Sequence, residues 1–307
     1  MAKELSTLID FIRYAATRFA VAELCFGHSH DNAIDEAAHL VLGSLALPPD
    51  LPPAYAQGRL TRQEREHLLS LIEQRIERRT PVAYLVGKAW FAGLQFKSDP
   101  RALVPRSPIA ELIEDGFGPW LEGREVQQVL DLCTGSGCIG IAMAVHYPDW
   151  QVDLSDVSKP ALQLALENIE FQHVGERLQL IESDLFANLQ GKRYHLIVSN
   201  PPYVTETEYA QMPGEYEHEP KLGLTSGEDG LDLPLRILDE ATNHLFEEGL
   251  LIVEVGESER ALTALLPDVP FVWLDFKVGS MGVFLLDRKA LQMHASSIHA
   301  AAQARQR

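Results

Sequence analysis

Long apolar stretches and cysteines are both scarce in this sequence, and each scarcity excludes a class of protein. No run of about 20 consecutive apolar residues is present, so no segment is expected to span a membrane. The three cysteines, Cys25, Cys133 and Cys138, are few, odd in number and set among apolar neighbours. They are therefore expected to be reduced core thiols of a cytoplasmic protein rather than disulfides or metal ligands. Glu4 and Asp10 stand where a signal peptide would need a basic and then an apolar stretch.

Basic residues are scarce as well. The chain holds 26 Lys and Arg against 44 Asp and Glu, which gives a net charge of −18. A protein that grips a nucleic-acid backbone normally presents a basic face, so direct nucleic-acid binding is not expected. Residues 1–90 carry 10 basic and 11 acidic side chains, whereas the remainder carries 16 and 33. This uneven distribution of charge suggests two domains.

Residues 1–87 are predicted to form a small helical domain. Apolar residues recur at helical spacing over residues 4–26. Asp31 is expected to cap a second helix, and Thr61 with Glu64 forms a capping box that opens a third. No residue of this unit indicates chemistry, and no metal site is predicted. We therefore expect a recognition or lid module.

Residues 88–105 are predicted to be a connecting hairpin or linker, and residues 106–290 alternate strand and helix signals. This alternation is typical of a doubly wound α/β sheet. Residues 278–282 are too short for a parallel crossover, so the last two strands should form an antiparallel edge hairpin. Residues 291–307 are expected to be a frayed tail. The predicted strands are Val126–Leu132, Val152–Val157, Leu178–Ser183, Leu196–Ser199, Leu250–Val255, Phe271–Lys277 and Val283–Asp287.

A glycine-rich loop follows the first predicted strand of the sheet. Gly135, Gly137 and Gly140 satisfy the pattern G-x-G-x-x-G, which permits a ligand to approach the backbone at the start of a helix. A dinucleotide pyrophosphate or the carboxylate of an amino-acid-like cofactor could use this loop equally. Asp156, which ends the second strand, can accept hydrogen bonds from two ribose hydroxyls, and this suits NAD or an adenosyl group.

Asp131 helps to separate these two cofactors. It lies four residues before the first glycine, where a carboxylate would repel a pyrophosphate. A cofactor with a sulfonium and an ammonium group would be attracted instead. The position of this acid therefore favours S-adenosylmethionine over NAD, with ordinary helix capping as the alternative role for Asp131.

The segment Asn200-Pro201-Pro202-Tyr203 ends another apolar strand abruptly. Neither proline can donate to a sheet ladder, so the strand must stop there and present an amide, free carbonyls and an aromatic ring. Asn200 Oδ1 and the Pro201 carbonyl can each accept one N–H of a target amino group. That arrangement would favour a pyramidal nitrogen and direct its lone pair at a methyl group. Tyr203 can stack on a flat amide or base.

Ligand-binding candidates follow four successive strands, at residues 133–137, Asp156, Ser183–Leu185 and Asn200–Tyr203. The carboxyl ends of parallel strands share one edge of a sheet, where α/β folds bind ligands. Asp184 could accept from an adenine amino group, with Leu185 against the ring. Neither a general base nor a metal is required for this chemistry.

These motifs together resemble class I S-adenosylmethionine-dependent methyltransferases that act on planar nitrogens, with a seven-stranded Rossmann-like sheet. Residues 104–111, Val-Pro-Arg-Ser-Pro-Ile-Ala-Glu, are similar to the protein-glutamine N5 branch. They depart from the Pro-Arg-Pro pattern of release-factor enzymes and are similar to the enzymes for large-subunit ribosomal protein three. Residues 215–220 and 222–230 also resemble this branch.

The resemblance implies a glutamine N5-methyltransferase acting on a basic ribosomal protein, and it places the functional residues. The expected cofactor-binding residues are Asp131, Cys133, Thr134, Gly135, Ser136, Gly137, Asp156, Asp184, Leu185 and Asn200. Asn200, Pro201 and Tyr203 are the expected catalytic residues, and these with Pro202 would hold the glutamine. The alternatives are a release-factor enzyme, a nucleic-acid adenine-N6 methyltransferase, and a non-catalytic nucleotide-binding module that would have no use for Asn200–Tyr203.

Acidic residues are concentrated directly after this tetrapeptide. Between Val204 and Asp232, Lys221 is the only Lys or Arg. A ribosomal protein not yet bound to RNA should be strongly basic, so an acidic rim would speed its encounter with the enzyme. The sequence therefore predicts a docking surface that includes Glu215, Glu217 and Glu219, with a merely solubilising loop as the alternative.

Overall fold

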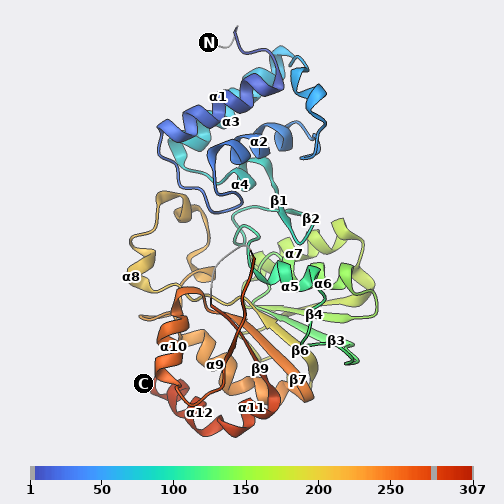
Figure 1. The fold of residues 1–307 in the computed structure, drawn as a ribbon, viewed down its shortest axis with the longest axis vertical. Coiled ribbons are helices and arrows are strands. Elements are labelled where there is room, and N and C mark those ends of the chain that lie inside the picture. The colour runs from blue at the N-terminus through green and yellow to red at the C-terminus, as the bar shows by residue number, and fades with distance from the viewer. Residues whose placement is uncertain (1–3, 278–281, 306–307) are drawn as a thin grey trace.

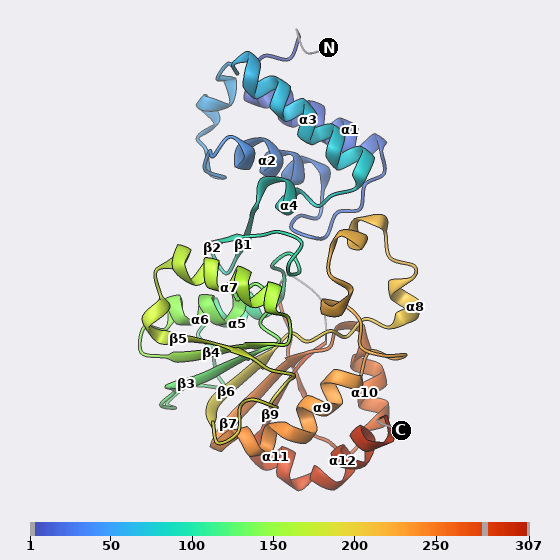
Figure 2. The same ribbon diagram turned by 180° about the vertical axis from the view of Figure 1, so that it is seen from behind.

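The computed structural model describes residues 4–277 and 282–305. A bundle of helices formed by the N-terminal part lies at one end of the molecule, above a sheet with helices on both faces (Figure 1). Seen from behind, a loop segment that contains α8 (Glu206–Tyr209) rises from the sheet towards the bundle (Figure 2). The chain therefore connects its two parts twice, through the linker after the bundle and through this returning segment.

Seven strands form one mixed sheet in the order β5-β4-β3-β6-β7-β9-β8. Neighbouring strands from β5 to β7 run parallel, while β9 and β8 run antiparallel to their neighbours. The predicted α/β sheet with an antiparallel edge hairpin is confirmed. The strands are β3 (Gln128–Leu132), β4 (Gln151–Asp156), β5 (Leu178–Glu182), β6 (Tyr194–Ser199), β7 (Leu245–Glu254), β8 (Val272–Trp273) and β9 (Val283–Asp287).

Helices cover both faces of the sheet, and successive residues of its central strands point to opposite faces. Val129 packs into a cluster beneath α5, α6 and α7, whereas Leu130 packs into the cluster beneath α9, α11 and α12. Both residues are fully buried, which explains why the central strands carry nearly continuous apolar runs. The helices of this part are α5 (Ile109–Glu114), α6 (Cys138–His146), α7 (Lys159–Gln172), α9 (Asp232–Ala241), α10 (Glu259–Leu265), α11 (Arg288–Met293) and α12 (Ala295–Ala304).

One strand of the edge hairpin is shorter than predicted, whereas β9 has the predicted bounds. β8 comprises only Val272 and Trp273, and the residues that would connect it to β9 include 278–281, which lie outside the described residues. The Leu274 N–H still donates to the Val283 carbonyl at 2.9 Å. Leu274 and Phe276 pack against the cluster beneath α5, α6 and α7.

The N-terminal bundle has its own apolar cluster, formed by α1 (Leu8–Val21), α2 (Ala33–Ser44), α3 (Arg62–Arg78) and α4 (Val82–Val86). The predicted capping box of Thr61 and Glu64 is present at the start of α3. The expectation that Asp31 caps α2 is wrong. Asn32 is the cap, because its Oδ1 accepts from the backbone N–H groups of Ile34 and Asp35 at 3.1 and 3.0 Å.

An antiparallel hairpin joins the bundle to the sheet. It consists of β1 (Lys88–Phe91) and β2 (Leu94–Lys97), within the residues for which a hairpin or extended linker was expected. The Asn168 side chain on α7 accepts from the Lys97 N–H at 2.7 Å and donates to the Lys97 carbonyl at 3.2 Å. The hairpin is thereby fixed to the helix layer rather than free in solvent.

The expected frayed C-terminal tail is folded instead, as α11 and α12. Ile298 and Ala302, one helical turn apart, are buried against α9. Arg305 pairs with Asp229 and with Asp232. The alanine-rich composition favours a helix, and this apolar pair gives that helix a face to bury. No helix in the described part of the chain is long and apolar enough to cross a membrane.

Glu215, which was expected on an exposed acidic rim, is buried against the helical bundle. Only 1% of it is exposed, and its Oε1 accepts from the Cys25 N–H at 3.0 Å. The same oxygen accepts from Arg75 at 3.2 Å and from Arg79 at 3.3 Å. Arg75 is itself buried and also donates to Glu36 at 2.6 Å. Glu215 therefore fastens the segment after β6 to α3 and cannot meet a partner protein.

Glu219 is buried in the same way, on the other side of this segment. It accepts from the Val104 N–H at 2.9 Å and from the Arg106 guanidinium at 2.7 Å through each of its two oxygens. Burial acts to raise its pKa, but Arg106 and His28 outweigh that effect and lower the pKa of Glu219 to about 2. The predicted docking role of Glu215 and Glu219 is therefore wrong, because these charges are consumed by internal ion pairs.

Replacing Arg75 by Met should lower the free energy of unfolding by about 3–5 kcal/mol, because Glu36 and Glu215 would remain buried without their counter-charge. Urea titration followed by circular dichroism measures this. Arg62→Met is the matched control, because Arg62 and Glu66 form an ion pair on the exposed face of the same helix. A loss for Arg75→Met no larger than that of the control would show that the buried pairs do not hold the segment.

Candidate active site

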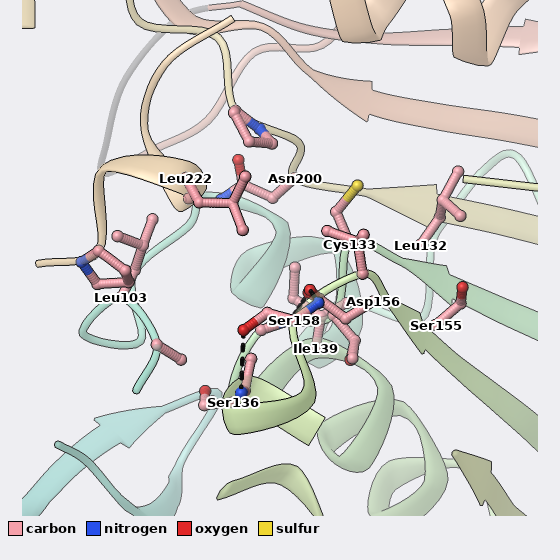
Figure 3. A pocket seen from close by; sticks show the side chains of 18 of the residues that line it. Leu103, Leu132, Cys133, Ser136, Ile139, Ser155, Asp156, Ser158, Asn200 and Leu222 are labelled. Atoms are coloured by element: carbon pink, nitrogen blue, oxygen red, sulfur yellow. Dashed lines mark hydrogen bonds between the residues drawn. The ribbon is translucent and has the colours of Figure 1, made fainter. Parts of the chain in front are cut away.

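A cavity of about 380 Å³ opens where the parallel strands of the sheet end. Figure 3 shows Asp156, Ser158 and Ser136 on one side of this cavity, with Asn200 and Leu222 on the opposite side. The four sequence-predicted segments meet here. Their lining residues are Cys133, Thr134, Gly135 and Ser136 after β3, Asp156 at the end of β4, Asp184 and Leu185 after β5, and Asn200 and Pro202 after β6.

The loop after β3 depends on backbone conformations that favour glycine. Gly135 and Gly137 have φ of +57° and +83°, in the region where a side chain is strained. A Cβ on Gly137 would lie 2.8 Å from Ile141 Cδ1. Gly137 is the residue before α6 and does not line the cavity. The loop therefore turns tightly enough to bring Thr134 to Ser136, at the start of α6, onto the cavity wall.

Asp131 supports this loop from behind and does not line the cavity, so the expectation that it meets the cofactor directly is wrong. It is fully buried, and its Oδ2 accepts from the Gly140 N–H at 2.8 Å and from the Thr134 hydroxyl. Burial raises the pKa of Asp131 to about 7, although these hydrogen bonds act against the shift. Helices cover both faces of β3. The sequence could not show that the Asp131 side chain points towards the start of α6 and the loop rather than into the cavity.

Asp156 is held in one orientation at the wall of the cavity. Its Oδ2 accepts from the Gly135 N–H at 2.9 Å, and its Oδ1 accepts from the Ser158 N–H at 2.8 Å. Burial raises the pKa of this carboxyl, and the backbone hydrogen bonds oppose that shift. Each carboxylate oxygen has a second acceptor site, so Asp156 can still receive two hydroxyl groups from a ligand.

The segment after β5 contributes one charged and one apolar side chain to the cavity. Asp184 is exposed and pairs with Arg236 of α9 at 3.0 Å. Leu185 is buried and has a φ of +46°. Arg236, which also lines the cavity, was not found from the sequence because it lies on an amphipathic helix with no motif. The pair leaves Asp184 one carboxylate oxygen for a ligand.

Asn200 presents an uncommitted amide to the cavity. Among the described residues none forms a hydrogen bond with its side chain, whereas the preceding Ser199 hydroxyl donates to the Leu132 carbonyl at 2.7 Å. The strand end is thus fixed while the next side chain remains available. Pro202 lines the cavity, but Pro201 and Tyr203 do not. The Tyr203 hydroxyl donates instead to Glu254 at 2.8 Å.

Two segments that were not assigned to the site also form its walls. Residues 101–106 run along the cavity, and Leu103 faces Leu222 across its mouth (Figure 3). A Cβ on Gly223 would lie 3.2 Å from Leu103 Cγ, so the two segments are in close contact. Leu222 lies in the stretch 222–230, which the sequence marked only by resemblance, and Leu103 lies just before the stretch 104–111 and was not marked at all. An apolar loop residue carries no chemical signal of its own.

Replacing Asp131 by Asn should change how stability depends on pH. Because burial raises the pKa of Asp131 from 3.8 to about 7, the folded protein binds this proton more tightly than the unfolded chain. Stability from this group is therefore present at low pH and lost as pH rises towards 7. Relative to Asp131→Asn, the wild-type free energy of unfolding should fall by a few kcal/mol across that window. Urea titrations at a series of pH values test this, and a constant difference would contradict it.

Comparison with known proteins agrees with this geometry. A model of the methyltransferase small domain matches residues 119–214. A ribosomal protein uL3 glutamine methyltransferase of Xylella fastidiosa strain Temecula1 is 60% identical over 304 residues, which are 99% of this chain and 97% of the relative. One from Xanthomonas campestris pv. campestris is 59% identical over 304 residues, which are 99% of this chain and 98% of that relative.

A solved structure shares the fold alone. The hMettl16 catalytic domain in complex with MAT2A 3'UTR hairpin 6 has a TM-score of 0.50 and 16% identity, covering 72% of this chain and 80% of that one. The predicted enzyme class and its cofactor, S-adenosylmethionine, are confirmed by the family matches. The chain belongs to the family of ribosomal protein uL3 glutamine methyltransferases.

Proposed function

We propose that this enzyme transfers a methyl group from S-adenosylmethionine to the side-chain amide nitrogen of a glutamine in ribosomal protein uL3, in the cytoplasm. The observation that carries the proposal is the Asn200 side chain. It faces the cavity at the end of a rigid strand and has no hydrogen-bond partner among the described residues. Its side-chain atoms are not among the fully buried polar atoms that lack a partner, so they are accessible from the cavity and can bind a substrate directly.

The cavity walls suit an adenosyl cofactor. Asp156 would accept from the ribose hydroxyls with the acceptor sites that Gly135 and Ser158 leave open. Asp184 would receive the adenine amino group, with Leu185 against the ring. The Ser136 N–H, beside the start of α6, would donate to the carboxylate of the amino-acid part, whereas the N–H groups of Thr134 and Gly135 already donate to the Ser155 carbonyl and to Asp156. The bound cofactor supplies an electrophilic methyl group.

Asn200 and the Pro201 carbonyl would act on the nucleophile. The nitrogen of a glutamine amide is a poor nucleophile because its lone pair is delocalised into the carbonyl. Two acceptors, Asn200 Oδ1 and the Pro201 carbonyl, would each bind one N–H and stabilise the positive charge that develops on nitrogen. Because both acceptors sit on one strand end, the nitrogen would also be aligned with the methyl group. No general base is required, since the methylated amide cation is a strong acid.

The substrate protein would meet a smaller acidic surface than the sequence suggested. Glu206, Glu208, Glu217 and Glu228 of the segment after β6 are exposed, although Lys221 pairs with Glu206 at 2.7 Å. A basic ribosomal protein would still be attracted to these side chains. Leu103 and Leu222 at the mouth of the cavity would contact the chain on either side of the glutamine.

Incubation with methyl-labelled S-adenosylmethionine tests the substrate. The purified enzyme would be offered uL3, other ribosomal proteins, release factors and DNA in separate reactions. The proposal expects label in uL3 alone, at a glutamine located by mass spectrometry of its peptides. Equal or greater label in a release factor would reassign the enzyme to that substrate, and label in DNA adenine would reassign it to nucleic acid.

Replacing Asn200 by Ala should lower the rate of methyl transfer by roughly 10²–10³, the scale of losing one preorganised polar contact. The affinity for S-adenosylmethionine should change by no more than a few-fold, because the other cofactor contacts remain. Single-turnover kinetics and calorimetry measure the two quantities separately. Near wild-type turnover at saturating uL3 would exclude the assigned role of Asn200.

Replacing Asp156 by Ala should weaken the binding of S-adenosylmethionine by about 10–100-fold, because charge-assisted hydrogen bonds contribute about 1.5–3 kcal/mol. Glu182→Ala is the matched control. Glu182 is the register partner of Asp156 on β5 but is exposed and does not line the cavity. Calorimetry measures the affinity of each variant for S-adenosylmethionine. Equal affinities for Asp156→Ala and Glu182→Ala would argue against the ribose contact. Micromolar binding of NAD to the wild-type protein would revive the dinucleotide alternative.

A further inference from the structure

A buried carboxylate lies directly behind the Asn200–Tyr203 loop. Glu254 ends β7, beside β6, and only 3% of it is exposed. Ser199 and Val253 are the last register partners of these two strands, so Asn200 and Glu254 are the next residues on neighbouring strands. Within the described chain no Lys or Arg pairs directly with Glu254. Its two oxygens are satisfied by hydroxyl groups instead.

Tyr203 supplies one of these hydroxyls and is confined by the segment that contains Glu254. Its hydroxyl donates to Glu254 Oε1 at 2.8 Å, and its carbonyl accepts from the Ser258 hydroxyl at 3.2 Å. A Cβ on Gly256 would lie 2.6 Å from Tyr203 Cε2, so the ring packs directly on the glycine backbone. Burial raises the pKa of Tyr203, which keeps the phenol protonated as a donor.

Ser107, in the segment before α5, supplies the second hydroxyl. It donates to Glu254 Oε2 at 2.6 Å, while its Oγ accepts from the Ile109 N–H at 3.1 Å. The accepted bond at the start of α5 directs the serine proton towards Glu254. The neighbouring residue Arg106 lines the cavity and binds Glu219. One carboxylate therefore connects the loop after β6 with the segment before α5.

The geometry points to Glu254 as a positioning residue for methyl transfer, acting through Tyr203 and with Ser107 as its second donor. Hydrogen bonds to a carboxylate are roughly twice as strong as neutral ones. Glu254 thus holds Tyr203 at the end of a loop of only four residues, two of them prolines with fixed φ. Fixing Tyr203 fixes the orientation of Asn200 and of the Pro201 carbonyl. This inference rests on the proposed function, because it concerns where those two acceptors stand.

The same strand offers an internal comparison at its opposite end. Tyr194, the first residue of β6, is also buried and donates to Asp153 Oδ2 at 2.7 Å. Removing either phenol hydroxyl deletes a tyrosine–carboxylate hydrogen bond, at the start of β6 in one case and in the loop after β6 in the other. Tyr194 is far from the cavity along β6, whereas Tyr203 belongs to the loop that carries Asn200. A purely structural role predicts similar effects for the two, and a positioning role does not.

The experiment compares Tyr203→Phe, Glu254→Gln and their double variant with Tyr194→Phe, using uL3 and S-adenosylmethionine at saturation. Tyr203→Phe and Glu254→Gln should each lower kcat by about 10–100-fold, because small misplacements of reacting groups have effects of that size. The affinity for S-adenosylmethionine should stay within about twofold, since no cofactor contact is altered. Tyr194→Phe should keep the wild-type kcat, even if its melting temperature falls by as much as that of Tyr203→Phe.

The double variant tests whether the two residues act as one unit. If Glu254 acts through the Tyr203 hydroxyl, the double variant should be about as slow as the slower single variant. The inference would be overturned if the fold-losses in kcat of the two single variants multiplied in the double variant. It would also be overturned if Tyr203→Phe had the same kcat as Tyr194→Phe. If Glu254→Gln does not fold, Ser107→Ala replaces it and should lower kcat while leaving cofactor affinity unchanged. No transfer by the wild-type enzyme would instead overturn the proposed function itself.

Discussion

The ion pair of Glu219 with Arg106 is the contact on which the arrangement of the site depends. Both carboxylate oxygens of Glu219 accept from this guanidinium, and the Val104 N–H adds a third donor. His28 of the helical bundle lies 3.5 Å from the same carboxylate. Residues from the bundle, from the segment before α5 and from the loop after β6 therefore meet at one buried charge. A carboxylate in this position is stable only while all of these partners are in place.

This contact shows that part of the acidic composition of the chain is buried in ion pairs rather than exposed on its surface. Glu215 and Glu219 belong to the segment that looked most like an acidic surface, yet both are internal links to arginines far away in the sequence. The negative charge of the chain is therefore partly structural. The mouth of the cavity is bounded by a loop that is tied to both halves of the molecule. None of the described residues of the helical bundle lines the cavity, but the bundle supports this loop from behind through Arg75 and Glu215.

The sequence could predict the sheet and the position of the cavity because both follow from local patterns. Apolar runs that end in Asp156 or in Asn200-Pro201 specify strand ends, and parallel strands bring their carboxyl ends to one edge. It could not predict the partners of buried charges. Arg75 and Glu215 are separated by 140 positions, and an acid in a loop has the same local signature whether it is solvated or paired. Asp131 was misjudged for a similar reason, since its spacing from Gly135 does not reveal which way it turns.

The proposed reaction forms a bond between the transferred methyl group and the side-chain nitrogen of one glutamine. Its most direct test uses uL3 whose glutamine side chains carry nitrogen-15 and S-adenosylmethionine whose methyl group carries carbon-13. After incubation with the enzyme, nuclear magnetic resonance should detect a direct coupling between the transferred carbon and the side-chain nitrogen of a glutamine. A transferred methyl group without that coupling, on a lysine, a backbone nitrogen or an oxygen, would contradict the account.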